Sequence, residues 1–271
     1  MAGTQGEAGA GSGGKGITMW DWIGKLDELR RQNQLAVLVT VTKSNGSTPR
    51  KHGAKMIVLP DGTFFGTVGG GVPEHFALED ARKCLNELHG TTTNIPLQQR
   101  GEFPACGGTM ELYMELINNN PCLYLFGAGH IGQSLCRVLE GTPFRIHLID
   151  EREEWINSPL IPSNVIRHHS HWSDFIQNAI WCDRRTFVTV VTFNGTVDQQ
   201  VLEEVLPHPT RFIGMIGSKG KWAGVQKNLE GKGFDLSRVH CPVGHNNGGN
   251  SPQEIAISIA SQLLATYYGR E

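Results

Sequence analysis

The stretch that determines the fold is LYLFGAGHIGQSLCRVL, residues 123–139. An apolar run ending at Phe126 is followed at once by three spaced glycines and an amphipathic helical pattern. Gly127 permits a tight turn, Gly129 lets the backbone approach a phosphate, and Gly132 lets the helix pack on the strand. The stretch therefore predicts a Rossmann-type strand and helix, whose N-terminal N–H groups offer a site for an anion.

The chain beyond this stretch continues the same pattern. A second strand ends in Asp150, eighteen residues after Gly132, where an acid would meet a ribose hydroxyl. His130 is expected near this site or as a surface residue. Further strands are predicted at residues 164–168, 186–193, 211–217 and 239–243, with helices between them. The last helix begins with Ser251, Pro252 and Glu254 as a capping box. Alternating strands and helices predict a parallel, doubly wound sheet.

The first half of the chain has a different pattern. A helix is predicted from Met19, a strand buried on both faces at Leu35–Thr42, and a second helix starting at Pro73. Together with a strand at residues 109–117, this indicates a separate α/β domain. The expected division is a flexible leader or expression scar at 1–18, a first domain at 19–117, a linker at 118–121 and the Rossmann-like domain at 122–271.

Composition excludes several classes of protein. The 271 residues contain 24 Lys and Arg against 26 Asp and Glu, so neither nucleic acid nor an anionic membrane is an expected partner. The longest apolar runs have the length of strands and are too short to span a bilayer. The six cysteines contain no CxxC pair, which favours reduced thiols and a cytoplasmic location.

A lone cysteine stands in GEFPACGGTMEL, residues 101–112. Cys106 precedes two glycines and a strand pattern. A thiol in this position could be a nucleophile, a ligand, a contact that handles sulfur or a small core residue. Its sequence context alone leaves these alternatives open.

Six motifs together give a family resemblance. They are GSTPRKHGAKM, GTVGGGVPE and CGG in the first half, and GAGHIG, IGMIGSKGKW and SPQEIAISIASQLLA in the second. With these motifs in this order from about Met19 to the C-terminus, the chain resembles the XdhC/CoxI family. Those proteins are accessory factors for molybdenum hydroxylases such as xanthine dehydrogenase.

The resemblance implies an N-terminal XdhC/CoxI domain followed by a Rossmann-like domain. It also implies that the protein binds molybdenum cofactor, supports its sulfuration by a cysteine desulfurase, and delivers it to the hydroxylase. Turnover of a substrate by the protein itself is not implied. The cysteine of the CGG motif, Cys106, is the implied cofactor contact and the candidate molybdenum contact. We also expect a homodimer, which could enclose the ligand between protomers.

The chemistry of the motifs suits this role. Glycine turns permit close backbone approach and can form anion-binding nests, and a thiolate is a soft partner for molybdenum. Arg50 and Lys51 could pair with a phosphate, or Arg50 could be a solvated loop charge. Glu74 is a candidate cofactor-binding residue that could instead favour its helix N-terminus. Ser218, Lys219 and Lys221 could form a second anion site or an ordinary helix start. The candidate turn glycines of the first domain are Gly69, Gly70, Gly71, Gly107 and Gly108.

Three departures from the family pattern concern local shape. Pro73 replaces an aliphatic residue, Asn194 stands where a histidine is common, and residues 245–247 replace an apolar run.

The competing interpretation is an NAD(P)-dependent oxidoreductase, since the Rossmann site is open to NAD(P) or another nucleotide. No acid–base dyad beside the fingerprint supports it. A metal-dependent hydrolase is disfavoured, because eleven histidines give no HExxH or similar ligand spacing.

Overall fold

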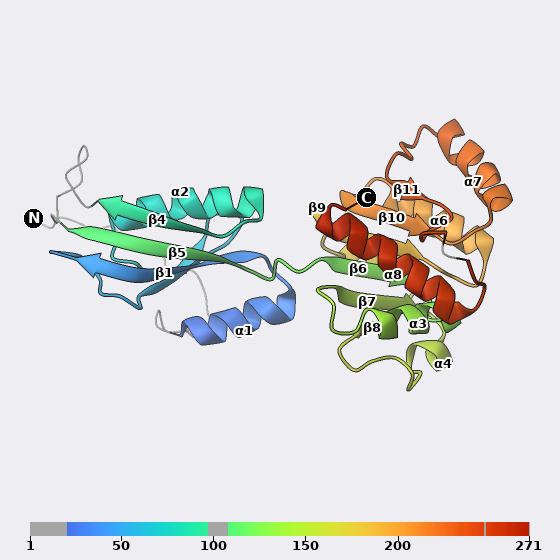
Figure 1. The fold of residues 1–271 in the computed structure, drawn as a ribbon, viewed down its shortest axis with the longest axis horizontal. Helices are drawn as coiled ribbons and strands as arrows, with labels where there is room; N and C mark the ends of the chain where they lie inside the picture. The colour runs from blue at the N-terminus through green and yellow to red at the C-terminus, as the bar shows by residue number, and fades with distance from the viewer. Residues whose placement is uncertain (1–20, 97–107, 247, 271) are drawn as a thin grey trace, which may run out of the picture. The chain divides into compact units, whose positions relative to one another are not determined.

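The computed structural model describes residues 21–96, 108–246 and 248–270 (Figure 1). The chain divides into two compact units, Met1–Asn119 and Asn120–Glu271. The division falls within residues 118–121, the segment predicted as the linker. The predicted leader, residues 1–18, lies outside the described residues. Each unit is described separately below.

Unit 1 is built on a five-stranded antiparallel sheet with the strand order β3-β2-β1-β5-β4. Helices α1 (Trp22–Gln32) and α2 (Val72–Glu87) lie on opposite faces of this sheet (Figure 1). The strands are β1 (Ala36–Asn45), β2 (Lys55–Val58), β3 (Phe64–Gly66), β4 (Thr91–Pro96) and β5 (Thr109–Ile117).

Strand β1 is the centre of unit 1, and it is buried on both faces as predicted. Val37 and Val39 belong to the core that includes Ala77 of α2, whereas Leu38 belongs to the core that includes Leu29 of α1. All five of these side chains are at most 7% exposed. A continuous apolar sequence is what a strand between two helices requires.

Strand β4 was missed by the sequence analysis, which predicts no element between α2 and the strand at residues 109–117. It pairs with β5, Thr91 opposite Met114, at the edge of the sheet. Of residues 91–95 only Ile95 is buried. An edge strand with one buried side chain lacks the apolar alternation on which such predictions depend.

Unit 2 is a parallel six-stranded sheet with the order β11-β10-β9-β6-β7-β8. The chain winds outward from β6 in both directions, which is the predicted doubly wound, Rossmann-like arrangement. The strands are β6 (Cys122–Phe126), β7 (Arg145–Asp150), β8 (Ile166–His169), β9 (Cys182–Val190), β10 (Thr210–Met215) and β11 (Val239–His240).

Helices cover both faces of this sheet. Helices α3 (His130–Val138) and α8 (Pro252–Tyr268) share one core, and α5 (Trp172–Asn178), α6 (Gly195–Val205) and α7 (Lys219–Gly231) share the other. The capping box predicted for the last helix is confirmed, since Ser251 and Glu254 bond each other's backbone. A one-turn helix, α4 (Glu153–Ile156), was not predicted. No helix in the described part of the chain has the length and apolarity needed to cross a membrane.

Two histidines on neighbouring strands form a half-buried stacked pair in unit 2. Nδ1 of His147 on β7 lies 3.0 Å from Nε2 of His168 on β8, and their ring centroids are 5.2 Å apart. Burial, reinforced by the positive charges of His168 and Arg145, lowers the pKa of His147 to about 3. Burial also lowers the pKa of His168. The folded unit therefore holds both rings neutral.

This pair should make the stability of unit 2 pH-dependent. Between about pH 3 and 6.5 the unfolded chain binds more protons than the folded one, so stability is lost as pH falls below 6.5. We expect the unfolding free energy of wild type to fall by up to about 1.4 kcal/mol per pH unit for each histidine. His147→Phe should flatten the curve between pH 6.5 and 5. Denaturant titrations at pH 8, 6.5 and 5 test this, and parallel curves for the two proteins would contradict it.

Candidate functional site

The turn between β6 and α3 places its three glycines as the fingerprint requires. Gly127 has φ +112°, and a Cβ there would lie 2.5 Å from the carbonyl oxygen of Val191. A Cβ on Gly132 would lie 2.0 Å from the carbonyl oxygen of Gly127. By contrast, no described atom lies within 4 Å of a Cβ on Gly129. Two glycines are therefore fixed by packing, and the third faces open space.

The N-terminus of α3 begins at this open position. Gly129 is the N-cap and offers no side chain to the first N–H groups of the helix. Gln133 donates from Nε2 to the carbonyl oxygen of Ala128 at 2.9 Å. This hydrogen bond joins the first turn of α3 to the glycine turn that precedes it. His130 is exposed, with its ring edge-on to Trp155 at 5.0 Å. The first N–H groups of the helix therefore have no side-chain cap, and the binding of an anion there stays a prediction.

Asp150, the predicted ribose acceptor, is already bound within the chain. Its Oδ2 accepts from the backbone N–H of Ala128 and from Nη2 of Arg152, both at 2.7 Å. Its Oδ1 accepts from the backbone N–H of Arg152 at 3.0 Å and from Nε of Arg152 at 2.9 Å. Because a carboxylate has about four lone-pair sites, a ribose hydroxyl would have to replace one of these bonds.

The electrostatics of Asp150 follow from these bonds. Burial acts to raise the pKa of its carboxyl, but hydrogen bonds from the Arg152 side chain and from two backbone N–H groups outweigh it. The pKa of Asp150 consequently lies below its ordinary value. Arg152 is held in turn between two rings, 5.1 Å from the Trp155 centroid and 4.6 Å from that of Phe193. The ion pair and the cation–π contacts fix the guanidinium in one place.

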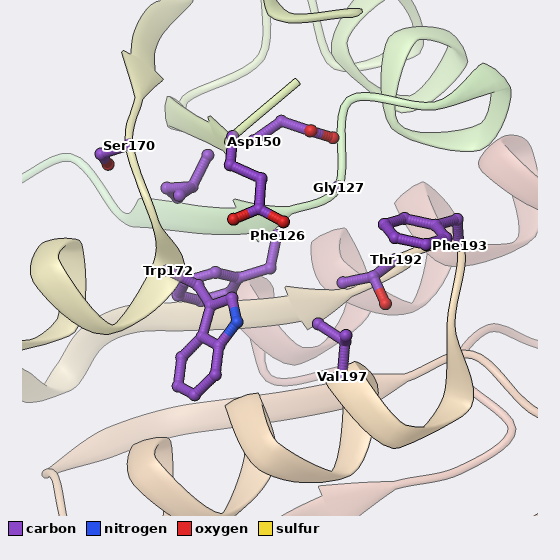
Figure 2. Close-up of a pocket in the computed structure, with 10 residues that line it drawn as sticks. Phe126, Gly127, Asp150, Ser170, Trp172, Thr192, Phe193 and Val197 are labelled. Carbon is purple, nitrogen blue, oxygen red and sulfur yellow. The ribbon is translucent and has the colours of Figure 1, made fainter. Parts of the chain in front are cut away.

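A pocket opens at the carboxyl ends of β6, β7 and β9, where Rossmann-like sheets bind ligands (Figure 2). Its cavity volume is about 30 Å³, about the space of one water, and it is open to solvent. Figure 2 shows Trp172 and Phe193 on opposite sides of this space, with Thr192 and Val197 near Phe193. Glu151 also lines the pocket and is exposed. The lining therefore combines aromatic faces with a carboxylate.

The predicted second anion site is arranged as a helix start with an ion pair. Ser218 caps α7, accepting from the backbone N–H of Lys221 at 3.2 Å, and Lys219 is exposed. Nζ of Lys221 lies 2.7 Å from Oδ2 of Asp198, whose other oxygen accepts from the Thr192 hydroxyl at 2.5 Å. Since Asp198 is 1% exposed, the charge of Lys221 is matched by a buried partner.

Cys241 lies beside this ion pair. A Cβ on Gly217 would lie 3.4 Å both from Sγ of Cys241 and from the side chain of Lys221. Burial raises the pKa of the Cys241 thiol to about 11, although the charge of Lys221 acts to lower it. The thiol is therefore protonated at neutral pH.

Three of the family motifs meet in unit 1. A Cβ on Gly69 would lie 2.6 Å from Cγ of Pro49 and 3.5 Å from Cγ of Arg50. A Cβ on Gly108 would lie 2.5 Å from the carbonyl oxygens of both Asn45 and Ser47. The loop that carries Arg50 thus touches the glycine triplet on one side and Gly108 on the other.

The remaining predicted residues of unit 1 divide into four groups. Gly70 and Gly71 have φ values of +75° and +57°, and no described atom lies within 4 Å of a Cβ on either. Glu74 accepts a hydrogen bond from the Thr67 hydroxyl, whose oxygen accepts from the N–H of Gly69 at 3.0 Å. Lys51 is exposed and Arg50 half-buried. Cys106 and Gly107 lie outside the described residues.

Sequence reasoning missed the residues that surround Asp150. Arg152, Glu151, Trp172 and Phe193 follow directly or closely after strands, so the rule that strand ends line the crevice would have indicated their region. No sequence pattern indicated that the guanidinium of Arg152 would form an ion pair with the carboxylate of Asp150. Among the described residues, no three His, Cys, Asp or Glu side chains form a potential metal site.

Comparisons with known proteins agree with this architecture. The XdhC Rossmann domain matches residues 123–263, more than half of the chain, and the XdhC and CoxI family matches residues 29–95. A crystal structure of a xanthine dehydrogenase from Bacillus halodurans aligns with a TM-score of 0.52 and 21% identity, covering 92% of this chain and 96% of that one. At this identity the likeness concerns the fold alone.

Two curated relatives extend over most of this chain. The uncharacterized protein YqeB of Escherichia coli is 31% identical over 245 residues, which is 88% of this chain and 44% of YqeB. This chain thus spans less than half the length of that relative. A probable xanthine dehydrogenase subunit of Bacillus subtilis is 21% identical over 321 residues, covering 89% of this chain and 96% of that protein. With both of its units matched in order, the chain belongs to the XdhC and CoxI family.

Proposed function

We propose that this protein is an accessory protein that binds molybdenum cofactor, supports its sulfuration and delivers it to a molybdenum hydroxylase such as xanthine dehydrogenase. Membership of the XdhC and CoxI family suggests an accessory or maturation role for xanthine dehydrogenase. The binding, sulfuration and delivery steps are the content of the proposal. It includes a cysteine desulfurase as the sulfur donor and a homodimeric state.

The observation that supports the proposal is the meeting of three family motifs in unit 1. Arg50, the glycine triplet and Gly108 come from separate loops, and they are held together by contacts that leave no space for a Cβ at Gly69 or Gly108. Such packing is unnecessary for a solvated loop. It is expected where several backbone segments together present one surface to a ligand.

The residues present fit an anionic, phosphate-bearing ligand. Gly70 and Gly71 face open space, and their positive φ values are conformations that glycine adopts without steric cost, so the backbone there is open to a ligand. Arg50 adds a guanidinium to the same region. Cys106 precedes Gly108 by two residues and would supply a soft thiolate. When bound, the cofactor would supply the molybdenum centre that the hydroxylase requires.

The alternative, an NAD(P)-dependent oxidoreductase, depends on unit 2 alone. Its principal residue is Asp150, whose carboxylate accepts four hydrogen bonds within the chain. Unit 1 would have no part in that activity, although its motifs are as closely packed as the fingerprint of unit 2. The accessory function accounts for the motifs of unit 1.

Co-expression tests the proposed function directly. A hydroxylase produced together with this protein should contain at least several-fold more sulfurated cofactor than the same hydroxylase produced alone, and its specific activity should rise in proportion. Cofactor and cyanide-labile sulfur are quantified in the purified hydroxylase. Equal contents in the two preparations would contradict the proposal.

Cys106→Ala tests the thiol contact. We expect at least a tenfold loss of cofactor retention on gel filtration under anaerobic conditions, with a change in unfolding free energy within about 0.5 kcal/mol. The matched control is Cys182→Ala, which removes a half-buried thiol of unit 2. It should retain the cofactor. A thiol that only fills space would give the opposite result, with binding kept and stability lowered by about 1 kcal/mol or more.

A further inference from the structure

Thr67 joins three parts of unit 1 around the glycine triplet Gly69–Gly71. It follows β3 directly, and its backbone N–H donates to the carbonyl oxygen of Lys55 on β2 at 3.1 Å. Its hydroxyl donates to Oε1 of Glu74 in the first turn of α2, and it accepts from the N–H of Gly69 at 3.0 Å. One side chain therefore connects the sheet, the triplet and the helix.

The carboxylate of Glu74 determines the direction of these hydrogen bonds. A hydroxyl has one proton to donate, whereas an ionised carboxylate can only accept. The Thr67 proton is therefore directed to Glu74, and the lone pairs of the hydroxyl oxygen remain for the N–H of Gly69. A hydrogen bond to a charged acceptor is also stronger than one between neutral groups. Without Glu74, the hydroxyl could rotate away from the orientation that accepts from Gly69.

The triplet depends on this contact because of its backbone conformation. Its φ values are +132°, +75° and +57°, and glycine loses more conformational freedom on folding than any other residue. Val68 and Val72 anchor the two ends of the triplet in the core of unit 1. Within the part of the chain that the structure describes, Gly69 is the one glycine of the triplet whose N–H has an acceptor. The hydrogen bond to Thr67 thus fixes the first residue of this turn.

The charge of Glu74 makes it a poor direct contact for the ligand of the proposed function. A phosphate-bearing cofactor is anionic, and a carboxylate beside it would repel it. Oε1 of Glu74 is already committed to the Thr67 hydroxyl. Both residues belong to the motif GTVGGGVPE, residues 66–74, which carries the triplet between them. The acid is therefore better explained by its effect on Thr67 than by contact with the ligand.

We propose that Glu74 is a positioning residue for the cofactor site of unit 1. It orients the hydroxyl of Thr67, and this hydroxyl holds the N–H of Gly69. The contact fixes the conformation in which Gly70 and Gly71 are open to the ligand. The inference rests on the proposed function for the identity of that ligand, whereas the chain of hydrogen bonds can be measured in the free protein.

Amide hydrogen exchange in the full-length protein tests the chain of hydrogen bonds without a ligand. The exchange of the Gly69 N–H, followed by NMR, should be roughly tenfold faster in Thr67→Val than in wild type, because the acceptor is lost. Glu74→Met should also accelerate it, while Thr67→Ser keeps the hydroxyl and should preserve the wild-type rate. The matched control is Thr63→Val, which removes another hydroxyl that donates to a carboxylate, that of Asp61, at 2.7 Å. It should leave the Gly69 exchange unchanged.

Cofactor retention distinguishes positioning from direct contact. On anaerobic gel filtration with molybdenum cofactor, Thr67→Val and Glu74→Met should each retain about tenfold less cofactor than wild type. The double variant should lose no more than either single variant, because both changes break the same chain of hydrogen bonds. Thr67→Ser and Thr63→Val should retain the cofactor as wild type does. Additive losses, or a loss in Glu74→Met that Thr67→Val does not share, would indicate direct contact by Glu74 and overturn the inference.

The remaining outcomes separate this inference from the proposed function. If wild type itself retains no cofactor, the proposed function fails, and the inference is then decided by the exchange of Gly69 alone. An exchange rate unaltered in Thr67→Val and Glu74→Met overturns it. A purely structural role would lower the thermal midpoint of both variants and leave cofactor retention intact, and that result would also overturn the inference.

Discussion

The hydrogen bonds of the Asp150 carboxylate hold together the edge of unit 2 at which the strands β6 and β7 end. The carboxylate joins the turn after β6, through Ala128, to the segment after β7, through Arg152. Because a buried carboxylate is costly without partners, these hydrogen bonds must form together. They orient Arg152 against Trp155 and Phe193, and they leave Glu151 as the acid open to the pocket. One ion pair thus sets both the shape and the polarity of this region.

The two units solve the same problem of backbone approach in different ways. Unit 2 uses glycines at a strand-to-helix turn, where Gly132 contacts the carbonyl of Gly127 and Gly129 remains open. In unit 1, Gly69 and Gly108 contact one loop from two sides, while Gly70 and Gly71 remain open. In both units some glycines are required because other atoms leave no space for a Cβ, and others leave the backbone open to the surroundings. A count of glycines alone cannot distinguish these roles, but the atoms around each position can.

Much of unit 2 could be predicted because its signals are local. The fingerprint at Gly127–Gly132, the apolar strands and the capping box at Ser251 each lie within a few residues. What could not be predicted depends on side-chain geometry or on distant partners. The engagement of Asp150 by Arg152 requires a particular rotamer, and β4 is defined by its pairing with β5 more than by its own residues. Cys106 and Gly107, predicted from the family motif, lie outside the described residues, so their roles stay predictions.

The pairing of β1 with β5 has a consequence for how the chain folds during synthesis. Thr42 bonds Glu111 across 69 residues, and β1 lies between β2 and β5 in the sheet. At a translation rate of roughly 5–20 residues per second, this partner is synthesised about 3–14 s after Thr42. Until then the edge of β1 that later pairs with β5 presents unpaired backbone N–H and C=O groups. Cellular holdases that cover such edges would act on this nascent protein before its second unit emerges from the ribosome.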